Sequence, residues 1–216
     1  FEDKLNISEF RNLKYLDLSH NNLEILRLNH LNIENILEYL NLSFNSISFI
    51  EENAFDTCKI LKILDLSFNK IKIFWNRKLD FIHYFYINNN ELISFDVSFQ
   101  TNIIHIDVSF NYLTDFSKSE FFYTILPFEI KLNNNLMSKL KFYELKKLKN
   151  LENLDLSFNK LERGEHDMIY SLNRLKVLYL NNNKLNFLSS DIFKNLIKLK
   201  IVNLSSNFIE YIQNDL

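Results

Sequence analysis

Hydrophobic and polar positions alternate in short segments that recur at nearly constant intervals along the chain. Each segment is numbered here from its first apolar residue. Positions 1, 4, 6 and 11 are apolar, positions 3, 5 and 7 are polar or mixed, and position 9 is asparagine. An apolar residue at every second position predicts a short β-strand with one buried face. Representative segments are LKYLDLSHNNL from Leu13, LKILDLSFNKI from Leu61 and LENLDLSFNKL from Leu151.

These segments start near residues 13, 37, 61, 82, 103, 127, 151, 175 and 199, so successive starts lie 24 or 21 residues apart. Fixed self-similarity of this period predicts a solenoid, in which each repeat packs only against its neighbours. We expect a single array over residues 1–216 with about nine repeats, and with both ends truncated within a repeat. Nine parallel strands at a spacing of about 4.8 Å would form a sheet roughly 40 Å across.

Position 9 is the point at which the chain leaves the strand and turns inward. An asparagine side chain carries both a donor and an acceptor, so it can bond backbone groups of its own turn and of the next repeat. A hydrophobic side chain would leave those groups unpaired, at about 1–3 kcal/mol each. We therefore predict a structural asparagine ladder made of Asn21, Asn45, Asn69, Asn90, Asn111, Asn135, Asn159, Asn183 and Asn207.

The second half of each repeat is less regular. In the eighth repeat, Leu188, Phe193 and Leu196 occupy positions 14, 19 and 22, which suits a turn followed by a short helical or irregular outer segment. The two 21-residue repeats, Leu61–Phe81 and Ile82–Asn102, have shorter outer segments, and residues 94–98 look extended. The predicted fold class is an α/β solenoid with one parallel sheet.

The pattern LxxLxLxxNxL, followed by an outer LxxxxFxxL, resembles leucine-rich repeat proteins over essentially the whole chain. Phenylalanine at position 19, as at Phe55 and Phe193, is similar to the extracellular "typical" class with a 24-residue repeat. That class includes Toll-like receptor ectodomains, insect chaoptin-like adhesion proteins and secreted immune leucine-rich proteins. The resemblance implies a horseshoe with a concave parallel β-sheet and an irregular or short-helical convex side.

The resemblance also implies a binding surface on the concave face, formed by positions 3, 5, 7 and 8. The candidate ligand-binding residues are Tyr15, Tyr39, Tyr84, Tyr86, His105 and Asp107. Tyrosine combines a large rigid contact area with a polar tip, which favours recognition; the alternative is that these rings serve cross-strand packing. His105 and Asp107 lie two residues apart, so they would share a face and could pair as a pH-sensitive spot.

Phenylalanine recurs at position 8, where ordinary repeat maintenance is a better explanation than a partner-binding stripe. The residues are Phe44, Phe68, Phe110 and Phe158. Lysines 139, 141, 146, 147 and 149 form a basic run that we interpret as a solvated convex surface. Cys58 occupies a position usually held by leucine, where we expect inert packing.

Charge and composition argue against several functions. The chain has 25 basic and 27 acidic residues, so it lacks the electrostatic footprint of a nucleic-acid or anionic-membrane binder. With one glycine it has no glycine-rich phosphate loop, and its five histidines show no metal-ligand spacing. No stretch reaches the length of a membrane span. We therefore expect neither an enzyme nor a cofactor or metal site in these residues.

Asn6, Asn41 and Asn203 each begin an N-glycosylation sequon. These sequons are compatible with secretion without arguing for it. Asn41 and Asn203 occupy position 5, so a sugar on either would lie on the concave face and restrict binding there.

The leading functional hypothesis is a macromolecular recognition module from a cell-surface receptor, an adhesion protein or an innate-immune ectodomain. It would be extracellular or membrane-attached, bind a protein or glycoprotein ligand, act in signal transduction or adhesion, and could dimerise with a related repeat protein. The alternative is a cytoplasmic scaffold or regulatory subunit, towards which the two 21-residue repeats lean slightly. An enzyme whose catalytic domain lies outside these residues is a third hypothesis.

Overall fold

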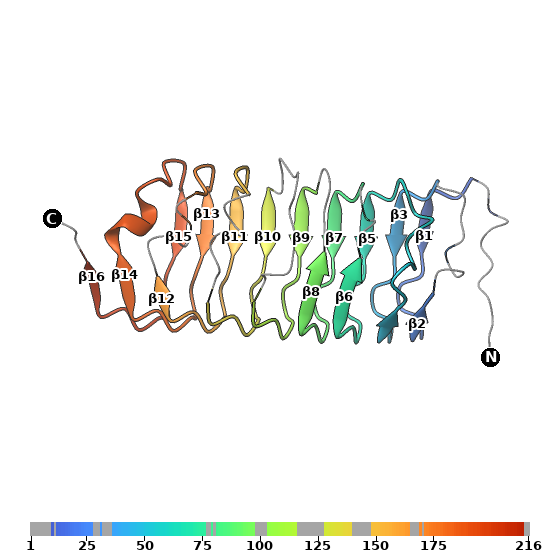
Figure 1. Ribbon diagram of the computed structural model, residues 1–216, viewed down its shortest axis with the longest axis horizontal. Helices are drawn as coiled ribbons and strands as arrows, with labels where there is room; N and C mark the ends of the chain where they lie inside the picture. The colour runs from blue at the N-terminus through green and yellow to red at the C-terminus, as the bar shows by residue number, and fades with distance from the viewer. Residues whose placement is uncertain are drawn as a thin grey trace.

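The computed structural model describes residues 10, 12–27, 31, 36–76, 79, 81–97, 103–115, 128–139, 148–164, 169 and 171–213. Nine short parallel strands lie side by side along the long axis of the molecule (Figure 1). In sheet order they are β1 (Tyr15–Asp17), β3 (Tyr39–Asn41), β5 (Ile63–Asp65), β7 (Tyr84–Tyr86), β9 (His105–Asp107), β10 (Glu129–Lys131), β11 (Asn153–Asp155), β13 (Val177–Tyr179) and β15 (Ile201–Asn203). The predicted parallel-sheet solenoid is confirmed.

Each strand pairs with the next one in register, repeat position against repeat position. Leu16 lies opposite Leu40, and Leu40 lies opposite Leu64. The 21-residue repeats keep the same register, because Leu64 lies opposite Phe85. The residues that the shorter repeats lack are therefore absent from their outer segments, as the sequence predicted, and the strand pairing of the main sheet is unchanged.

Shorter strands follow the main strands on the lower side of Figure 1 and form three small sheets. These strands are β2 (Ile25–Leu26) with β4 (Phe49–Ile50), β6 (Ile73–Asn76) with β8 (Ser94–Val97), and β12 (Arg163–Gly164) with β14 (Phe187–Ser189) and β16 (Tyr211–Gln213). Strand β8 confirms as far as Val97 the extended conformation expected for residues 94–98, and Ser98 lies outside the described residues. Within the described ranges, 3-10 helical geometry occurs at Leu31 and in the single turn η4 (Ser190–Phe193).

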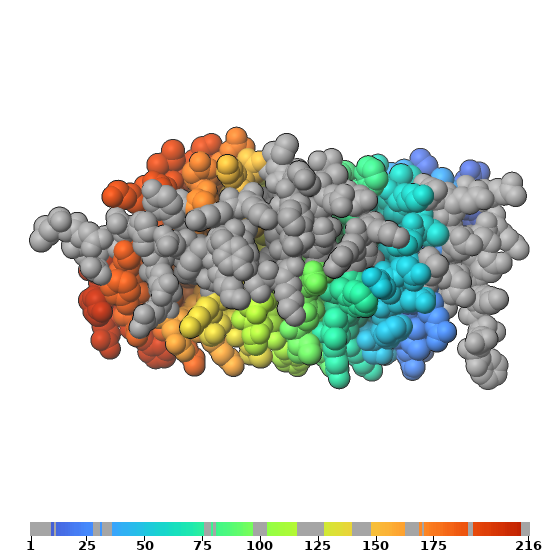
Figure 2. Space-filling model, viewed as in Figure 1, coloured from blue at the N-terminus to red at the C-terminus, as the bar shows by residue number. Residues whose placement is uncertain are grey.

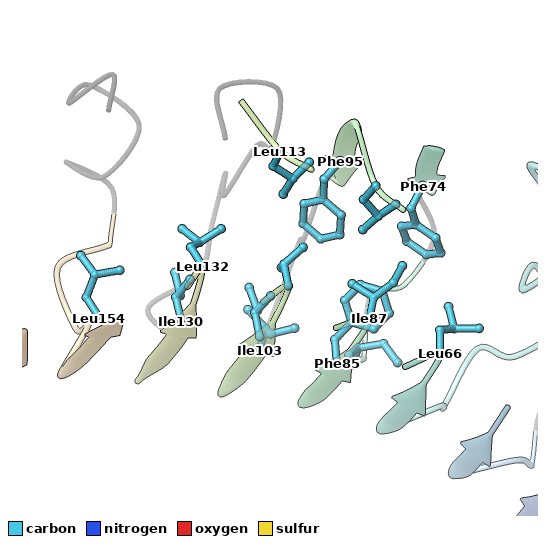
Figure 3. Packing of buried hydrophobic residues seen from close by; sticks show 14 of the residues in the cluster. Leu66, Phe74, Phe85, Ile87, Phe95, Ile103, Leu113, Ile130, Leu132 and Leu154 are labelled. Carbon is cyan, nitrogen blue, oxygen red and sulfur yellow. The ribbon is translucent and has the colours of Figure 1, made fainter. Parts of the chain in front are cut away.

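The hydrophobic core lies between the main sheet and the outer segments (Figure 3). Positions 4 and 6 point into it, and Leu64 and Leu66 are fully buried. In the 21-residue repeats phenylalanine fills the core: the ring of Phe74 lies 5.2 Å from that of Phe85 and 6.1 Å from that of Phe95, centroid to centroid. In Figure 2 the described atoms along the lower edge form a continuous band, as expected when every repeat packs on its neighbours.

The outer position 19 behaves differently in its two clear examples. Phe55 is buried in the core, whereas Phe193 at the end of η4 is partly buried and packs against it. Cys58 is buried as well, and burial raises the pKa of its thiol to about 11. This location agrees with the packing role expected for it.

The asparagine at position 9 holds adjacent repeats together. The Nδ2 group of Asn69 donates to the carbonyl of Leu66 in its own turn at 3.1 Å, and to Leu42 of the preceding repeat at 3.0 Å. Its Oδ1 accepts from the backbone N–H of Ile47 at 2.9 Å, also in the preceding repeat. The inter-repeat bonds therefore run backwards along the chain, and the expectation that they reach the next repeat was wrong.

The same bonds recur along the ladder. An inter-repeat bond from Nδ2 is present at Asn45, Asn69, Asn90, Asn111, Asn135, Asn159, Asn183 and Asn207. Asn21 donates to Leu18 and Ser19 within its own turn.

The residue before each ladder asparagine has a left-handed backbone, with φ between 52° and 56°. These position-8 residues are His20, Phe44, Phe68, Asn89, Phe110, Asn134, Phe158, Asn182 and Ser206. Asparagine tolerates this conformation well, whereas a bulky side chain adopts it at a cost of about 1 kcal/mol or more. The phenylalanines at position 8 therefore adopt this conformation at a local cost in backbone energy.

Candidate functional site

The outward face of the main sheet carries the side chains of positions 3 and 5. In β3, β5, β7, β10, β11 and β13 the middle residue is buried and the two flanking residues are partly exposed. All six candidate ligand-binding residues therefore lie on one face. They separate into two groups, with Tyr15 and Tyr39 on β1 and β3, and Tyr84, Tyr86, His105 and Asp107 on β7 and β9.

The tyrosines of the first group stack on each other. The rings of Tyr15 and Tyr39 are 4.0 Å apart and nearly parallel. Burial, the contact with Tyr15 and the nearby charges of Asp17 and Asp65 raise the pKa of Tyr39 to about 12. Cross-strand packing is thus one role of these rings, although Tyr15 still exposes more than half of its surface.

In the second group, His105 pairs with a different residue from the one expected. Its Nδ1 lies 2.8 Å from Oε2 of Glu129 on the next strand, and the expected pairing with Asp107 is absent. Neighbouring strands are about 4.8 Å apart, whereas residues two apart on one strand are separated by about 6.6 Å, so the cross-strand partner is closer. The His105 ring also lies 5.0 Å from that of Tyr86.

His105 is only 8% exposed, and its Nε2 atom is buried without a hydrogen-bond partner in the described part of the chain. Burial, reinforced by the charges of Asp65, Asp107 and Glu129, raises the pKa of the Tyr86 phenol. The β7–β9–β10 region thus gathers aromatic, imidazole and carboxylate groups in one place on the concave face.

Asp107 has a local structural role. Its Oδ1 accepts from the backbone N–H of Ser109 at 3.1 Å and from the Ser109 hydroxyl at 2.5 Å, which closes the turn after β9. Its Oδ2 lies 3.8 Å from Nζ of Lys131. The same turn is made by Asp65 with Ser67 and by Asp155 with Ser157.

Asparagine makes this turn as well as aspartate does. Oδ1 of Asn41 accepts from the N–H of Ser43 at 3.0 Å, and Oδ1 of Asn203 accepts from the N–H of Ser205 at 3.1 Å. Two of the three sequons therefore coincide with a turn that the repeat needs for its own geometry. Asn6, which begins the third, lies outside the described residues, as do Lys141, Lys146 and Lys147 of the basic run.

A shallow hollow of about 200 Å³ continues the concave site towards the C-terminal strands. It is lined by Glu129, Ile130, Lys131, Asn153, Leu154, Asp155, Val177 and Tyr179. None of these residues was among the candidates, although most occupy the same positions 3 and 5 and could have been found from the strand register. Only the three-dimensional arrangement shows that the surface is hollowed there.

Position 2 carries a row of ion pairs at the border of the face. Glu38 lies 2.6 Å from Lys62 and 3.3 Å from Lys14, and these lysines lower the pKa of its carboxyl group. Lys176 and Glu152 form a similar pair at 2.6 Å. These lysines are therefore already matched by carboxylates of adjacent repeats.

Position 8 forms a partly exposed aromatic ridge beside the face. The ring of Phe44 stacks on those of His20 and Phe68, with centroids 4.4 and 4.2 Å apart. Phe110 and Phe158 are separated from this stack by asparagines and are about half exposed. The stacking agrees with the structural interpretation of position 8.

Within the described residues no group of three or more His, Cys, Asp or Glu side chains is placed to hold a metal ion. No helix in the same part of the chain is long and apolar enough to cross a membrane. The arrangement of the concave face supports non-covalent contact with a partner.

Comparison with known proteins agrees with this architecture. Leucine-rich repeat family models match residues 35–92 and residues 12–35, 150–172 and 174–196. No curated protein sequence matches the chain.

Several solved structures share the fold. The leucine-rich repeat domain of LRIM1 has a TM-score of 0.72 and 22% identity over 95% of this chain and 72% of its own. An internalin (inlF) from Listeria monocytogenes has a TM-score of 0.67 and 19% identity over 96% of this chain, which spans 58% of the internalin chain. The leucine-rich repeat domain of APL1B has a TM-score of 0.63 and 18% identity, and the match covers 97% of this chain and 74% of that domain.

The asparagine ladder, the in-register parallel sheet and the family models lead to the same conclusion. Leucine-rich repeat arrays present extended concave surfaces to binding partners. This chain belongs to the leucine-rich repeat family and is a protein-interaction module.

Proposed function

We propose that this chain is the recognition module of an extracellular or cell-surface protein, and that it binds a protein or glycoprotein partner on the concave face between β5 and β13. The observation that carries the proposal is the continuity of that face. The cluster of Tyr86, His105 and Glu129 leads directly into the hollow beside Asp155 and Tyr179. Tyrosines that are only partly buried combine contact area with hydrogen-bonding capacity.

The positions of two sequons support the same location. Asn41 on β3 and Asn203 on β15 both lie outside the span from β5 to β13. Sugars at both positions would flank the proposed surface and leave it open. The extracellular assignment rests on the resemblance to the 24-residue extracellular class, with which the sequons are compatible.

Glycan insertion gives a direct test of the binding face. Asp107→Asn completes a sequon with Val108 and Ser109, and the turn should survive because Asn41 and Asn203 already form it. Ile197→Ser creates a matched control sequon at Asn195, outside the main sheet, where Ile197 is 83% exposed. Both variants and the parent chain would be secreted from eukaryotic cells, immobilised, and compared for the surface and secreted proteins that they capture.

We expect at least one protein to bind the parent chain and the Ile197→Ser glycoform but not the Asp107→Asn glycoform. If the inserted glycan leaves every captured protein bound, the concave face is not the binding surface. The extracellular assignment has its own measurement, because glycosidase treatment of the natural protein should reduce its mass, and an unchanged mass would count against it.

A further inference from the structure

A row of alternating chemistry crosses the middle of the main sheet at position 5. The paired residues along this row are Asp65, Tyr86, Asp107, Lys131, Asp155 and Tyr179, each opposite the next. We call them the fifth-position row. A carboxylate stands on every second strand, a tyrosine follows Asp65 and another follows Asp155, and the one lysine lies between Asp107 and Asp155.

The carboxylates of this row can still form an ion pair with a cation. Each of Asp65, Asp107 and Asp155 uses Oδ1 to accept from the serine two residues later. Oδ2 takes no part in that turn, and at Asp107 it already lies 3.8 Å from the Lys131 ammonium group. The row thus has an excess of negative charge, because it holds three carboxylates and one lysine, while Lys62 and Lys176 at position 2 are paired with Glu38 and Glu152.

The spacing of the carboxylates indicates the geometry of a ligand. Alternate strands are about 9.6 Å apart, and slightly less at the side-chain tips of a concave sheet. A polyproline II helix has three residues per turn and rises about 9.3 Å per turn, so every third side chain faces the same way. An ordinary extended strand repeats its side chains about every 6.6 Å and does not match.

The tyrosines of the row suit the same ligand. Polyproline II segments are recognised by grooves lined with aromatic side chains, and tyrosine rings also attract Lys and Arg. Tyr86 lies between Asp65 and Asp107, and Tyr179 borders the hollow next to Asp155. The hollow has the volume to receive one side chain of such a segment.

His105 supplies an independent indication that the site is incomplete in the free protein. Its imidazole is buried among Tyr86, Glu129 and the row, yet Nε2 has no hydrogen-bond partner within the described residues. A buried polar atom without a partner costs about 1–3 kcal/mol. A ligand that reached this nitrogen would recover part of that cost.

We infer that the fifth-position row binds a basic segment of a protein partner, held as a polyproline II helix with Lys or Arg at every third residue. The segment would run across the strands, along the axis of the array. This inference rests on the proposed function, because it names the chemistry of the partner at the same face.

The test uses chain 1–216 produced without glycosylation and a fluorescent peptide of repeated Pro-Pro-Arg triplets. Controls are a peptide of the same composition in scrambled order and a Pro-Pro-Glu peptide, all followed by fluorescence anisotropy at low and moderate salt. We expect the triplet peptide to bind most tightly and its affinity to fall as salt rises. Equal binding of the scrambled peptide, or tighter binding of the acidic one, would overturn the inference.

Conservative variants locate the interaction. Asp65→Asn, Asp107→Asn and Asp155→Asn should each weaken binding about two- to fivefold, the range for exposed charge pairs. Lys131→Gln should strengthen it, because it removes the competing cation. Asp96→Asn on β8 is the matched control, since it makes the same change outside the main sheet and should have no effect. A loss at Asp96→Asn equal to that at Asp107→Asn would refute a site on the row.

The two proposals fail in distinguishable ways. One outcome is that the glycosylated Asp107→Asn variant loses its captured partner while the unglycosylated variant binds that partner as tightly as the parent chain does. In that case the concave face is the binding surface, but the inferred basic ligand is wrong. If the glycan has no effect either, the proposed function itself is wrong.

Discussion

The Nδ2 group of Asn69 donates a hydrogen bond to the carbonyl oxygen of Leu42, which lies 27 residues earlier, at 3.0 Å. The same amide accepts from Ile47 N–H, so one buried side chain satisfies backbone groups of two repeats. Stacking of neighbouring repeats therefore depends on polar contacts as well as on the leucine core.

Replacing this asparagine tests the ladder. Asn69→Leu leaves the Ile47 N–H and the Leu42 carbonyl without their partner, and should lower the free energy of unfolding by about 2–4 kcal/mol. Asn21→Leu is the matched control, because Asn21 is exposed and its amide donates within its own turn. Urea unfolding followed by circular dichroism would measure both variants. Equal losses at the two positions would show that the inter-repeat bonds contribute little.

The left-handed backbone at position 8 predicts that asparagine can replace phenylalanine. Phe158 has a φ of 54°, so Phe158→Asn should leave stability unchanged or raise it by about 0.5–1 kcal/mol. Phe68→Asn relieves the same backbone penalty but loses the ring stack on Phe44, which contributes about 0.5–1.5 kcal/mol. Thermal unfolding should therefore rank Phe158→Asn above Phe68→Asn. The reverse ranking would argue against a stabilising stack.

The buried thiol of Cys58 should resist modification. Burial raises its pKa to about 11, and only the thiolate reacts readily, so the native protein at pH 8 should react with an aromatic disulfide reagent far more slowly than the urea-unfolded protein. Colorimetric release of thiolate measures both rates. Fast labelling of the folded protein would contradict the buried position.

Alkaline pH should destabilise the N-terminal part of the sheet through Tyr39. Its pKa rises from 10.0 to about 12 on folding, so the unfolded chain loses the proton first. The stability contributed by the neutral phenol is complete below about pH 10 and is lost as pH rises towards about 12. Tyr39→Phe has no proton to lose, and its urea midpoint should fall less between pH 9 and pH 11 than that of the parent chain.

Lysine ion pairs also weaken at high pH in both proteins. The quantity to compare is therefore the slope of the urea midpoint against pH, in the parent chain and in the Tyr39→Phe variant. Absorbance at 295 nm follows phenolate formation directly. A parent chain and a Tyr39→Phe variant with identical pH slopes would show that the Tyr39 phenol does not couple to folding.

The repeat pattern by itself determined the architecture. Apolar residues at positions 4 and 6 decide which face of each strand is buried, because strand side chains alternate with a period of two. The asparagine at position 9 marks the end of each strand, so the repeat register, and with it the residues of the concave face, could be read along the chain. The extended segment at β8 was also predicted, whereas the equivalent strands of the 24-residue repeats, such as β4 and β14, were not.

Tertiary structure decided which side chains meet. His105 and Asp107 are two residues apart in sequence, but His105 contacts Glu129, and Asp107 turns to Ser109 and Lys131. Parallel in-register stacking places residues 24 positions apart at about 4.8 Å between strands, closer than any pair on one face of a single strand. The backward direction of the asparagine bonds and the hollow beside Asp155 follow from the same stacking. A periodic pattern specifies a face, and only the folded array specifies the neighbours on it.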